Sequence, residues 1–244
     1  HELYRPTPGA PRVYQAITKP IIRAYSTHRV ACGVEAAEYL FDSAEGVTLL
    51  RNSLDIDRVL HESEENVGLL RELIGAQPDE FILIQVARFT QVKNHLFSID
   101  VLEYLQDAGF RSRLVFIGDG PLRTKVSNYA EQKGVTKKTA FLGLREDVPQ
   151  LMGGADIMLL PSHFGGFPVV LVESQVIGLL AIVSQNVSQE VDLCDGLVSF
   201  LTIDDGPEVW SDAIRHKQLL TRSDANDRLQ PVSYTHLRAH ETRG

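Results

Sequence analysis

The chain has 244 residues, enough for one large domain or two small ones with a buried core. Its hydrophobic content of 43% and charged content of 23% are ordinary for a globular protein. The formal net charge of -8 argues against a nucleic-acid-binding protein, because phosphate-backbone recognition needs a basic surface. A few local cations can still hold one diphosphate, so a nucleotide ligand is compatible with this charge.

Cys32 and Cys194 lie far apart without metal-ligand spacing, which predicts free thiols in a reducing cytoplasm. No apolar run reaches the roughly 20 residues that a membrane-spanning helix needs. The first residues, HELYRP, contain neither a start methionine nor a signal peptide. We therefore expect a cytoplasmic location and a chain that begins inside a longer protein.

Short apolar runs alternate with helical stretches beyond residue 80. The predicted strands are 81–86 (FILIQV), 114–117 (LVFI), 157–160 (IMLL) and 179–183 (LLAIV). They are apolar throughout, as strands covered on both faces should be. The predicted helices are 95–108, 122–132 and 168–177, ended by Gly109, Gly134 and Gly178. This repetition predicts an α/β fold with a Rossmann-like, doubly wound parallel sheet.

The two ends of the chain follow this pattern less well. Residues 31–41 predict a helix, 46–50 a strand and 52–55 a turn, which could belong to the same sheet or end a preceding domain. A helix is predicted at 215–220. Residues 228–244 have no periodicity and are interpreted either as a solvated tail or as sequence that is not native to the protein.

Both interpretations of residues 228–244 make the same prediction. Removing them should leave the midpoint of thermal unfolding almost unchanged, because a segment without apolar periodicity has little surface to bury. Thermal unfolding of the full and shortened chains measures this directly. A loss of several degrees would show that the segment is native and packs on the fold.

The informative loops are those after the strands, because ligands bind beyond the carboxyl ends of a parallel sheet. Arg88 and Lys93 follow the first strand and precede a helix, so they could hold an anion such as a diphosphate. Basic residues near the start of a helix are also common on protein surfaces where they bind no ligand. The sequence alone leaves both interpretations open.

The second loop contains Gly118, Asp119 and Gly120. Its glycines permit a tight turn and close approach of a ligand. An ordinary strand-to-helix turn, with Asp119 as a helix cap, is the alternative. The loop lacks the G-x-G-x-x-G pattern of dinucleotide-binding proteins, which argues against a dehydrogenase.

The third loop is glycine-rich and leads through Pro168 into a helix, which leaves free backbone N–H groups at the sheet edge. Glu173 lies in that helix among apolar residues, where an unpaired carboxylate is costly. It therefore needs a partner. A structural ion pair and a ligand hydroxyl are equally compatible with the sequence.

Taken together, the segments ARFTQVKN, VFIGDGPLR, FLGLREDVPQLMGGADIMLLPS and GGFPVVLVESQ resemble the donor domain of retaining, family 4 (group 1) glycosyltransferases of GT-B fold. The resemblance covers about residues 27–214 and is greatest to members that build bacterial exopolysaccharide and capsule. It implies that 1–52 is a remnant of the N-terminal acceptor domain, 53–227 the nucleotide-sugar donor domain and 228–244 a tail. The acceptor domain would then be largely absent.

The resemblance also implies roles for single residues. Arg88 and Lys93 would grip the donor diphosphate and stabilise the leaving group. Glu173 would be the second glutamate of the family's E-x7-E motif and hold the ribose hydroxyls. The backbone at Leu144 would contact the base, and the backbone of Val169 and Val170 would cap the phosphates. The substrate-binding residues that the resemblance implies are Gly118, Asp119, Gly120, Leu144, Ser162, Gly165, Gly166, Phe167, Pro168, Val169, Val170 and Glu173.

One departure from the family pattern matters most. The first glutamate of E-x7-E, which reaches the transferred sugar near its reacting centre, would fall at position 165, where this chain has glycine. Glycine supplies neither a charge nor a side-chain acceptor. Ala87, where the family usually has glycine, and Ser53 are smaller departures. We therefore expect little or no transferase activity from this chain by itself.

For the complete enzyme, the resemblance implies transfer of a sugar from a nucleoside diphosphate to an acceptor hydroxyl with retention, without metal or cofactor. The implied acceptor is a saccharide or lipid-linked saccharide, so the full-length enzyme would contact the inner face of the membrane peripherally. A non-catalytic nucleotide-sugar-binding module is the main alternative. A nucleotide-sugar epimerase fits less well, because it would need acid–base residues from the missing half.

Overall fold

The computed structural model describes residues 10–31, 34–49 and 54–223. The N-terminal elements are α1 (Ala10–Tyr25), β1 (Val30–Ala31), α2 (Val34–Phe41) and β2 (Thr48–Leu49). The two short strands pair in parallel with each other and not with the main sheet. These residues therefore do not extend the main sheet, which was one of the two alternatives. Ala31 lies in β1, so the predicted helix 31–41 begins too early. The first two residues of the predicted turn at 52–55 lie outside the described residues.

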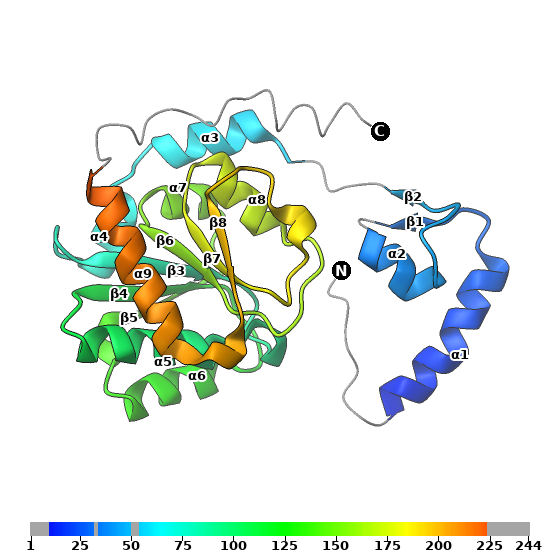
Figure 1. The fold of residues 1–244 in the computed structure, drawn as a ribbon, viewed down its shortest axis with the longest axis horizontal. Coiled ribbons are helices and arrows are strands. Elements are labelled where there is room, and N and C mark those ends of the chain that lie inside the picture. Colours follow the sequence, from blue (N-terminus) through cyan, green and yellow to red (C-terminus); the bar gives the residue numbers. More distant parts are fainter. Residues whose placement is uncertain (1–9, 32–33, 50–53, 224–244) are drawn as a thin grey trace.

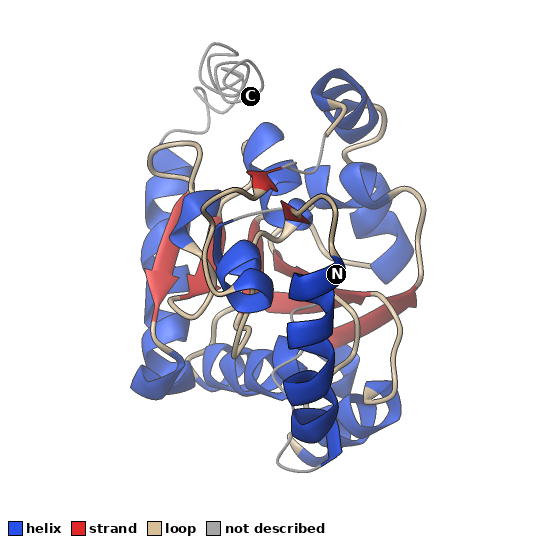
Figure 2. Cartoon of the chain, turned by 90° about the vertical axis from the view of Figure 1, so that its right-hand side faces the viewer, coloured by secondary structure: helices blue, strands red, loops and turns tan. Residues whose placement is uncertain are grey.

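The remaining described residues form a six-stranded, all-parallel sheet between helices (Figures 1 and 2). Its strands are β3 (Phe81–Val86), β4 (Ser112–Ile117), β5 (Thr139–Gly143), β6 (Ile157–Leu160), β7 (Ala181–Ser184) and β8 (Val198–Leu201). Their spatial order is β5-β4-β3-β6-β7-β8. The chain thus starts in the middle, moves out to β5, and returns to the other side of β3. This confirms the predicted α/β, Rossmann-like doubly wound sheet.

Helices cover both faces of the sheet. On one face lie α5 (His95–Asp107), α6 (Arg123–Gln132) and α9 (Gly206–Ser223). On the other lie α3 (Ile56–Glu64), α4 (Leu69–Ile74), α7 (Val148–Gly153) and α8 (Val169–Val176). Short 3₁₀ turns are η1 (Gln91–Lys93), η2 (Thr136–Lys138), η3 (Gln189–Val191) and η4 (Ile203–Asp205). Among the described residues, no helix is long and apolar enough to cross a membrane.

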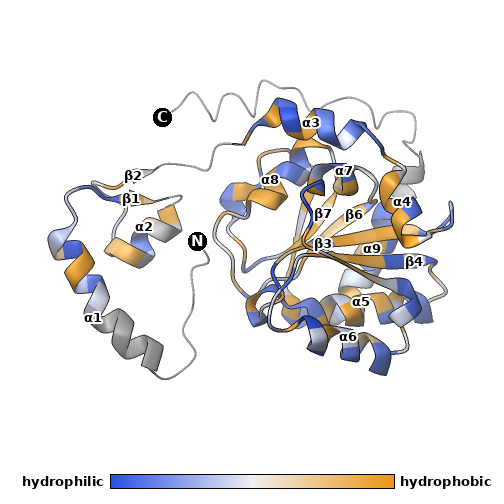
Figure 3. Ribbon diagram, turned by 180° about the vertical axis from the view of Figure 1, so that it is seen from behind, coloured by the Kyte–Doolittle hydropathy of each residue, from blue (hydrophilic) through white to orange (hydrophobic). Residues whose placement is uncertain are grey.

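The central strands β3, β6 and β7 are mostly apolar because both of their faces are buried (Figure 3). In β3, Phe81 and Leu83 pack toward the α5 face, whereas Ile82 and Ile84 pack toward the α7 and α8 face. This alternation is the two-residue period of a strand. The same period places Gln85, the one polar residue of β3, on the α5 face.

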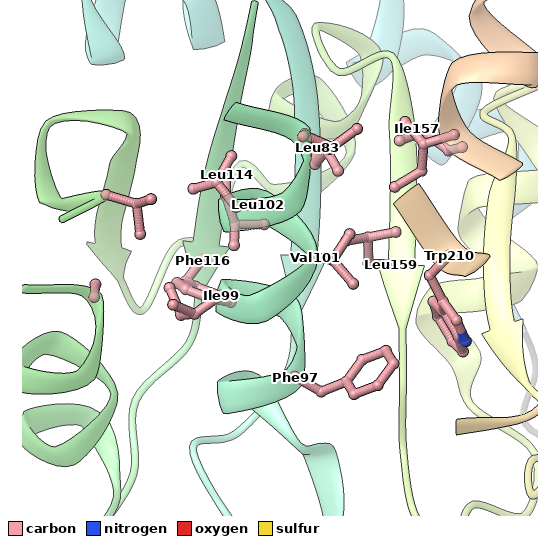
Figure 4. Packing of buried hydrophobic residues seen from close by; sticks show 14 of the residues in the cluster. Leu83, Phe97, Ile99, Val101, Leu102, Leu114, Phe116, Ile157, Leu159 and Trp210 are labelled. Carbon is pink, nitrogen blue, oxygen red and sulfur yellow. The ribbon is translucent and has the colours of Figure 1, made fainter. Parts of the chain in front are cut away.

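Helix α9 closes the α5 face of the core. Trp210 is fully buried, and its ring meets Phe97 edge to face with centroids 5.2 Å apart (Figure 4). The Trp210 Nε1–H donates to the Thr202 carbonyl oxygen at 3.0 Å, so the buried indole is satisfied. The sequence predicted only the end of this helix, at 215–220, because its first turns lack a strong apolar run.

The amino edge of the sheet carries a buried ion cluster around Glu80. The carboxylate of Glu80 accepts from Arg113 Nε at 2.7 Å, Lys138 Nζ at 2.5 Å and the Gln77 amide at 2.8 Å. Its side chain is 1% exposed. Burial by itself raises the pKa of Glu80, but these hydrogen bonds outweigh burial and lower the pKa to about 2. The cluster joins β3, β4 and η2 at the amino edge of the sheet, opposite the loops that follow the strands.

Candidate active site

The candidate site lies at the carboxyl edge of the sheet, above the gap between β3 and β6. At this point the chain reverses direction across the sheet, so the loops after β3 and β6 lead away from each other. Such a switch point leaves a crevice in which parallel α/β proteins bind ligands. The loop after β3 carries Arg88 and Lys93, and the loop after β6 carries residues 161–168.

The loops after β3 and β4 pack directly on each other. The Phe89 amide donates to the Asp119 carbonyl at 3.0 Å, and the Leu122 amide donates to the Phe89 carbonyl at 3.1 Å. A Cβ atom at Gly118 would lie 2.2 Å from the Ala87 oxygen, and one at Gly120 would lie 2.7 Å from the Phe89 backbone. Both glycines also have positive φ, of 132° and 156°. Glycine is therefore required at both positions by the close approach of two backbones.

The ordinary-turn interpretation predicted that Asp119 caps the following helix, but it does not. Helix α6 begins after Leu122 without a side-chain cap, and Asp119 is exposed. Asp119 contributes its backbone carbonyl to the Phe89 contact instead. The loop is thus part of the site's floor rather than a simple helix entry.

The loop after β6 is tied to its neighbours on both sides. The His163 amide donates to the Val92 carbonyl at 2.8 Å, which joins it to the loop after β3. Gly165 pairs with Val187, and the Ser188 amide donates to the Gly165 carbonyl at 3.0 Å, which joins it to the loop after β7. The site's rim is therefore a continuous hydrogen-bonded frame rather than a set of separate loops.

The two predicted cations occupy this frame. Arg88 is exposed, and its guanidinium forms no hydrogen bond or ion pair with the parts of the chain that the structure describes. Lys93 is half-buried and ends the turn η1, two residues before α5 begins. Asn94, which lies between Lys93 and the first residue of α5, adopts a left-handed φ of 50° that turns the chain sharply into the helix.

The start of α8 follows the loop after β6, at the same edge of the sheet. Pro168 precedes the helix in an extended conformation (φ -74°, ψ 111°), and Val169 is the first helical residue, one later than predicted. No side chain caps this end. The N–H groups of Val169 and Val170 lie in the first turn, where intrahelical acceptors do not exist. Together with Gly166 and Phe167, which are half-buried, they form an edge suited to an anion.

Glu173 lies one turn into α8 and is partly buried. Within the described residues it forms no ion pair, which argues against the structural-ion-pair interpretation. Burial raises the pKa of Glu173, the positive charge of Arg58 lowers it, and the negative charge of Glu62 raises it again. Arg58 itself pairs with Glu62 at 3.5 Å. A half-buried carboxylate that pairs with no cation among the described residues is suited to accepting hydrogen bonds from ligand hydroxyls.

Leu144 and Ser162 lie at the two sides of the site. Leu144 follows β5 and is 80% exposed, next to an Arg145–Asp147 pair joined by two hydrogen bonds of 2.8 and 2.6 Å. Ser162 follows β6, and its buried Oγ has no hydrogen-bond partner among the described residues. An exposed apolar side chain and an unsatisfied hydroxyl at one sheet edge are features of a ligand-binding surface.

The sequence analysis did not identify His95 and Gln85 as part of this site. His95 begins α5 and stacks on Phe89 with ring centroids 4.1 Å apart. Burial lowers the pKa of His95 to about 4, the Ala87 carbonyl opposes this, and the Lys93 charge adds to it. The ring is therefore neutral near pH 7 and packs among aromatic side chains at the start of α5. A polar residue inside an apolar strand, such as Gln85, was the available signal.

Comparison with known proteins agrees with this geometry. The family model described as "Glycosyl transferases group 1" matches residues 69–230. The chain belongs to the group 1 glycosyltransferases. The fold is that of GT-B glycosyltransferases, with its sheet, switch point and loops as described above.

Relatives of this group 1 glycosyltransferase include "Putative glycosyltransferase EpsF" of Bacillus subtilis (strain 168), 34% identical over 207 residues that cover 83% of this chain and 54% of that protein. An Escherichia coli "UDP-Gal:alpha-D-GlcNAc-diphosphoundecaprenol alpha-1,3-galactosyltransferase" is 29% identical over 142 residues, covering 57% of this chain and 36% of that protein. The chain thus spans about half, or less, of the length of these relatives.

Solved structures show the same fold. The structure of Anabaena HepE in complex with UDP-glucose superposes with a TM-score of 0.71 at 17% identity, covering 95% of this chain and 65% of that one. The C-terminal domain of a group 1 glycosyltransferase (LpcC) from Francisella tularensis superposes with a TM-score of 0.57 at 15% identity, covering 78% of this chain and 98% of that one. At these identities the likeness concerns the fold.

Proposed function

We propose that this chain binds a nucleoside-diphosphate sugar at the carboxyl edge of its sheet. The complete protein would transfer the sugar to an acceptor hydroxyl with retention, in polysaccharide assembly. The observation that carries the proposal is that two loops are joined at the β3–β6 switch point, where the His163 amide donates to the Val92 carbonyl. One of these loops holds Arg88 and Lys93, and the other leads into the uncapped start of α8. These groups supply positive charge and free N–H groups in one place, as a diphosphate requires.

Each group would have a separate role. Arg88 and Lys93 would bind the diphosphate oxygens and stabilise the charge that develops as the sugar leaves, which is electrostatic catalysis. The N–H groups of Val169 and Val170 would cap the phosphates. Glu173 would accept hydrogen bonds from the ribose hydroxyls. Leu144 would contact the base from the β5 side.

The acceptor we propose is a saccharide or lipid-linked saccharide, bound by the N-terminal half of the full-length enzyme at the inner face of the membrane. The printed name of the Escherichia coli relative, a diphosphoundecaprenol galactosyltransferase, supports a lipid-linked acceptor. We also retain the proposal that 1–52 belongs to an acceptor domain and 53–227 to the donor domain. The separate two-stranded pairing of β1 and β2 supports this division.

The proposal is tested by calorimetric titration of the chain with UDP, GDP and ADP. We expect one of them to bind, and Arg88→Ala and Lys93→Ala each to weaken that binding by about 10- to 100-fold, because a charge-assisted contact to phosphate is lost. Arg111→Ala is the matched control. Arg111 is an exposed cation paired with Asp79 at the opposite edge of the sheet, so its loss should not change the affinity.

Two outcomes would contradict the donor site. One is that none of the three diphosphates binds the folded chain. The other is that all three variants, including the control, weaken binding equally, since that would indicate a diffuse charge effect. Weakening confined to the Arg88 and Lys93 variants supports the proposed site and identifies the base.

A second candidate function is a module that binds a nucleotide sugar without turnover. The observation that favours it is Gly165, which supplies no carboxylate to the reacting centre. Under both proposals the chain by itself should show little or no sugar transfer, measured with a radiolabelled donor and saccharide acceptors. Product formed by this chain alone would contradict that expectation.

A further inference from the structure

Gln85 is a fully buried amide in an otherwise apolar strand, directly beneath the candidate site. It is 0% exposed and lies in β3 on the face that packs against α5. Burying an amide costs free energy unless its hydrogen bonds are made. A leucine or valine at this position would fit the strand's pattern better. The amide therefore has a task that packing does not explain.

The hydrogen bonds of Gln85 lead to Lys93. Its Nε2 donates to the Lys93 carbonyl oxygen at 2.8 Å, and its Oε1 accepts from the buried Ser98 hydroxyl at 2.7 Å. The chemistry fixes this orientation, because a backbone carbonyl only accepts and must face the amide NH₂. Ser98, one turn into α5, then has to donate. The amide thus ties strand β3 both to Lys93, at the end of η1, and to helix α5.

The backbone at this turn has an uncommon conformation that needs support. Asn94 has a positive φ of 50°, a region that side-chain-bearing residues seldom occupy. The Lys93 carbonyl held by Gln85 belongs to the peptide that connects Lys93 with Asn94. Fixing that peptide fixes the position from which the Lys93 side chain starts. A displacement of about 1 Å at such a group can cost on the order of 100-fold in function.

We propose that Gln85 is a positioning residue for Lys93, which sets the place of the cation in the diphosphate site. This inference rests on the proposed function. Gln85 does not touch the ligand and acts through the Lys93–Asn94 peptide. Ser98 has the secondary role of orienting the amide.

The test compares UDP affinity, or that of whichever diphosphate the parent chain binds, among variants. Gln85→Leu and Gln85→Glu should both weaken binding about tenfold, because both lack the NH₂ donor. Ser98→Ala keeps the donor and should weaken binding less. Gln106→Leu is the matched control: Gln106 donates to the Phe110 and Ser112 carbonyls at the other end of α5, far from the site. It should lower stability without changing affinity.

A double-mutant cycle separates positioning from general destabilisation. If Gln85 acts through Lys93, the Gln85→Leu, Lys93→Ala double variant should bind no more weakly than Lys93→Ala alone. Additive losses would overturn the proposal. The proposal would also be overturned if both Gln85 variants kept the parent affinity while Arg88→Ala and Lys93→Ala still weakened binding. That second result would contradict the positioning role alone and would still support the donor site.

Amide hydrogen exchange tests the same proposal without a ligand. Exchange of residues 91–95 should be faster in Gln85→Leu than in the parent chain and in Gln106→Leu. If the parent binds no diphosphate, the proposed function fails, and this exchange alone decides whether Gln85 holds the Lys93 turn. Unchanged exchange at 91–95 would overturn the positioning role.

Discussion

A Gly165→Glu variant, in a protein that also carries the N-terminal half, should transfer sugar at least about 100-fold faster than the same protein with Gly165. The reason is chemical: a carboxylate at this position would supply charge at the reacting centre, where glycine supplies none. The measurement is the initial rate of sugar transfer at saturating donor. This prediction rests on the proposed transferase function.

The structure has room for the Cβ atom of the new side chain. A Cβ at Gly165 would lie 3.4 Å from Val187 Cγ2, an ordinary contact distance, and Gly165 is not among the glycines with positive φ. Gly118 is the contrast, because a Cβ there would lie 2.2 Å from a backbone oxygen. Glycine is thus required at position 118 but not at position 165. We expect the unfolding midpoint of Gly165→Glu to stay close to that of the parent.

Gly165→Gln is the matched control, since it has the same size without the charge. It should fold and bind the donor as well as the glutamate variant but give little of the gain in rate. If the glutamate variant folds and binds the diphosphate yet transfers sugar no faster, the second proposal, a binding module without turnover, becomes the better account.

The largest expected effect on stability is at Glu80. Glu80→Gln should lower the free energy of unfolding by about 3 kcal/mol near neutral pH, because it leaves Arg113 and Lys138 without their buried counter-charge. Chemical denaturation measures the difference. Asp79→Asn is the control: the neighbouring Asp79–Arg111 pair is exposed, so its loss should cost less than about 1 kcal/mol.

The effect at Glu80 should depend on pH in a known direction. Its pKa in the folded state, about 2, is below its ordinary value of 4.5. The ionised group therefore contributes its full stabilisation above about pH 4.5 and loses it as the pH falls toward 2. The difference in the free energy of unfolding between the parent chain and Glu80→Gln should accordingly become smaller as the pH falls. A gap that stays constant down to about pH 3 would contradict this assignment.

The central strands could be predicted from sequence because their residues are buried on both faces. Residues 81–86 and 157–160 were predicted to the residue, since an apolar run must be covered whatever lies around it. Edge strands β5 and β8 were missed. Their residues are mostly half-buried, and a half-covered strand has no continuous apolar signal. Helices α3, α4 and α7 were missed as well. Shortness accounts for α4 and α7, which have six residues each, but not for α3, which has nine and is longer than the predicted α8.

The sequence by itself determined the parallel α/β architecture, the group 1 resemblance and the residue types available for an anion site. Only the tertiary structure decided that β3 and β6 are neighbours, which places the loop with Arg88 and Lys93 beside the loop that leads into α8. It also decided that Gly165 has room for a Cβ atom and that Gln85 holds the Lys93 turn. The physical reason is that strand order and the contacts between loops depend on burial across the whole sheet, whereas local periodicity reports only which residues are buried.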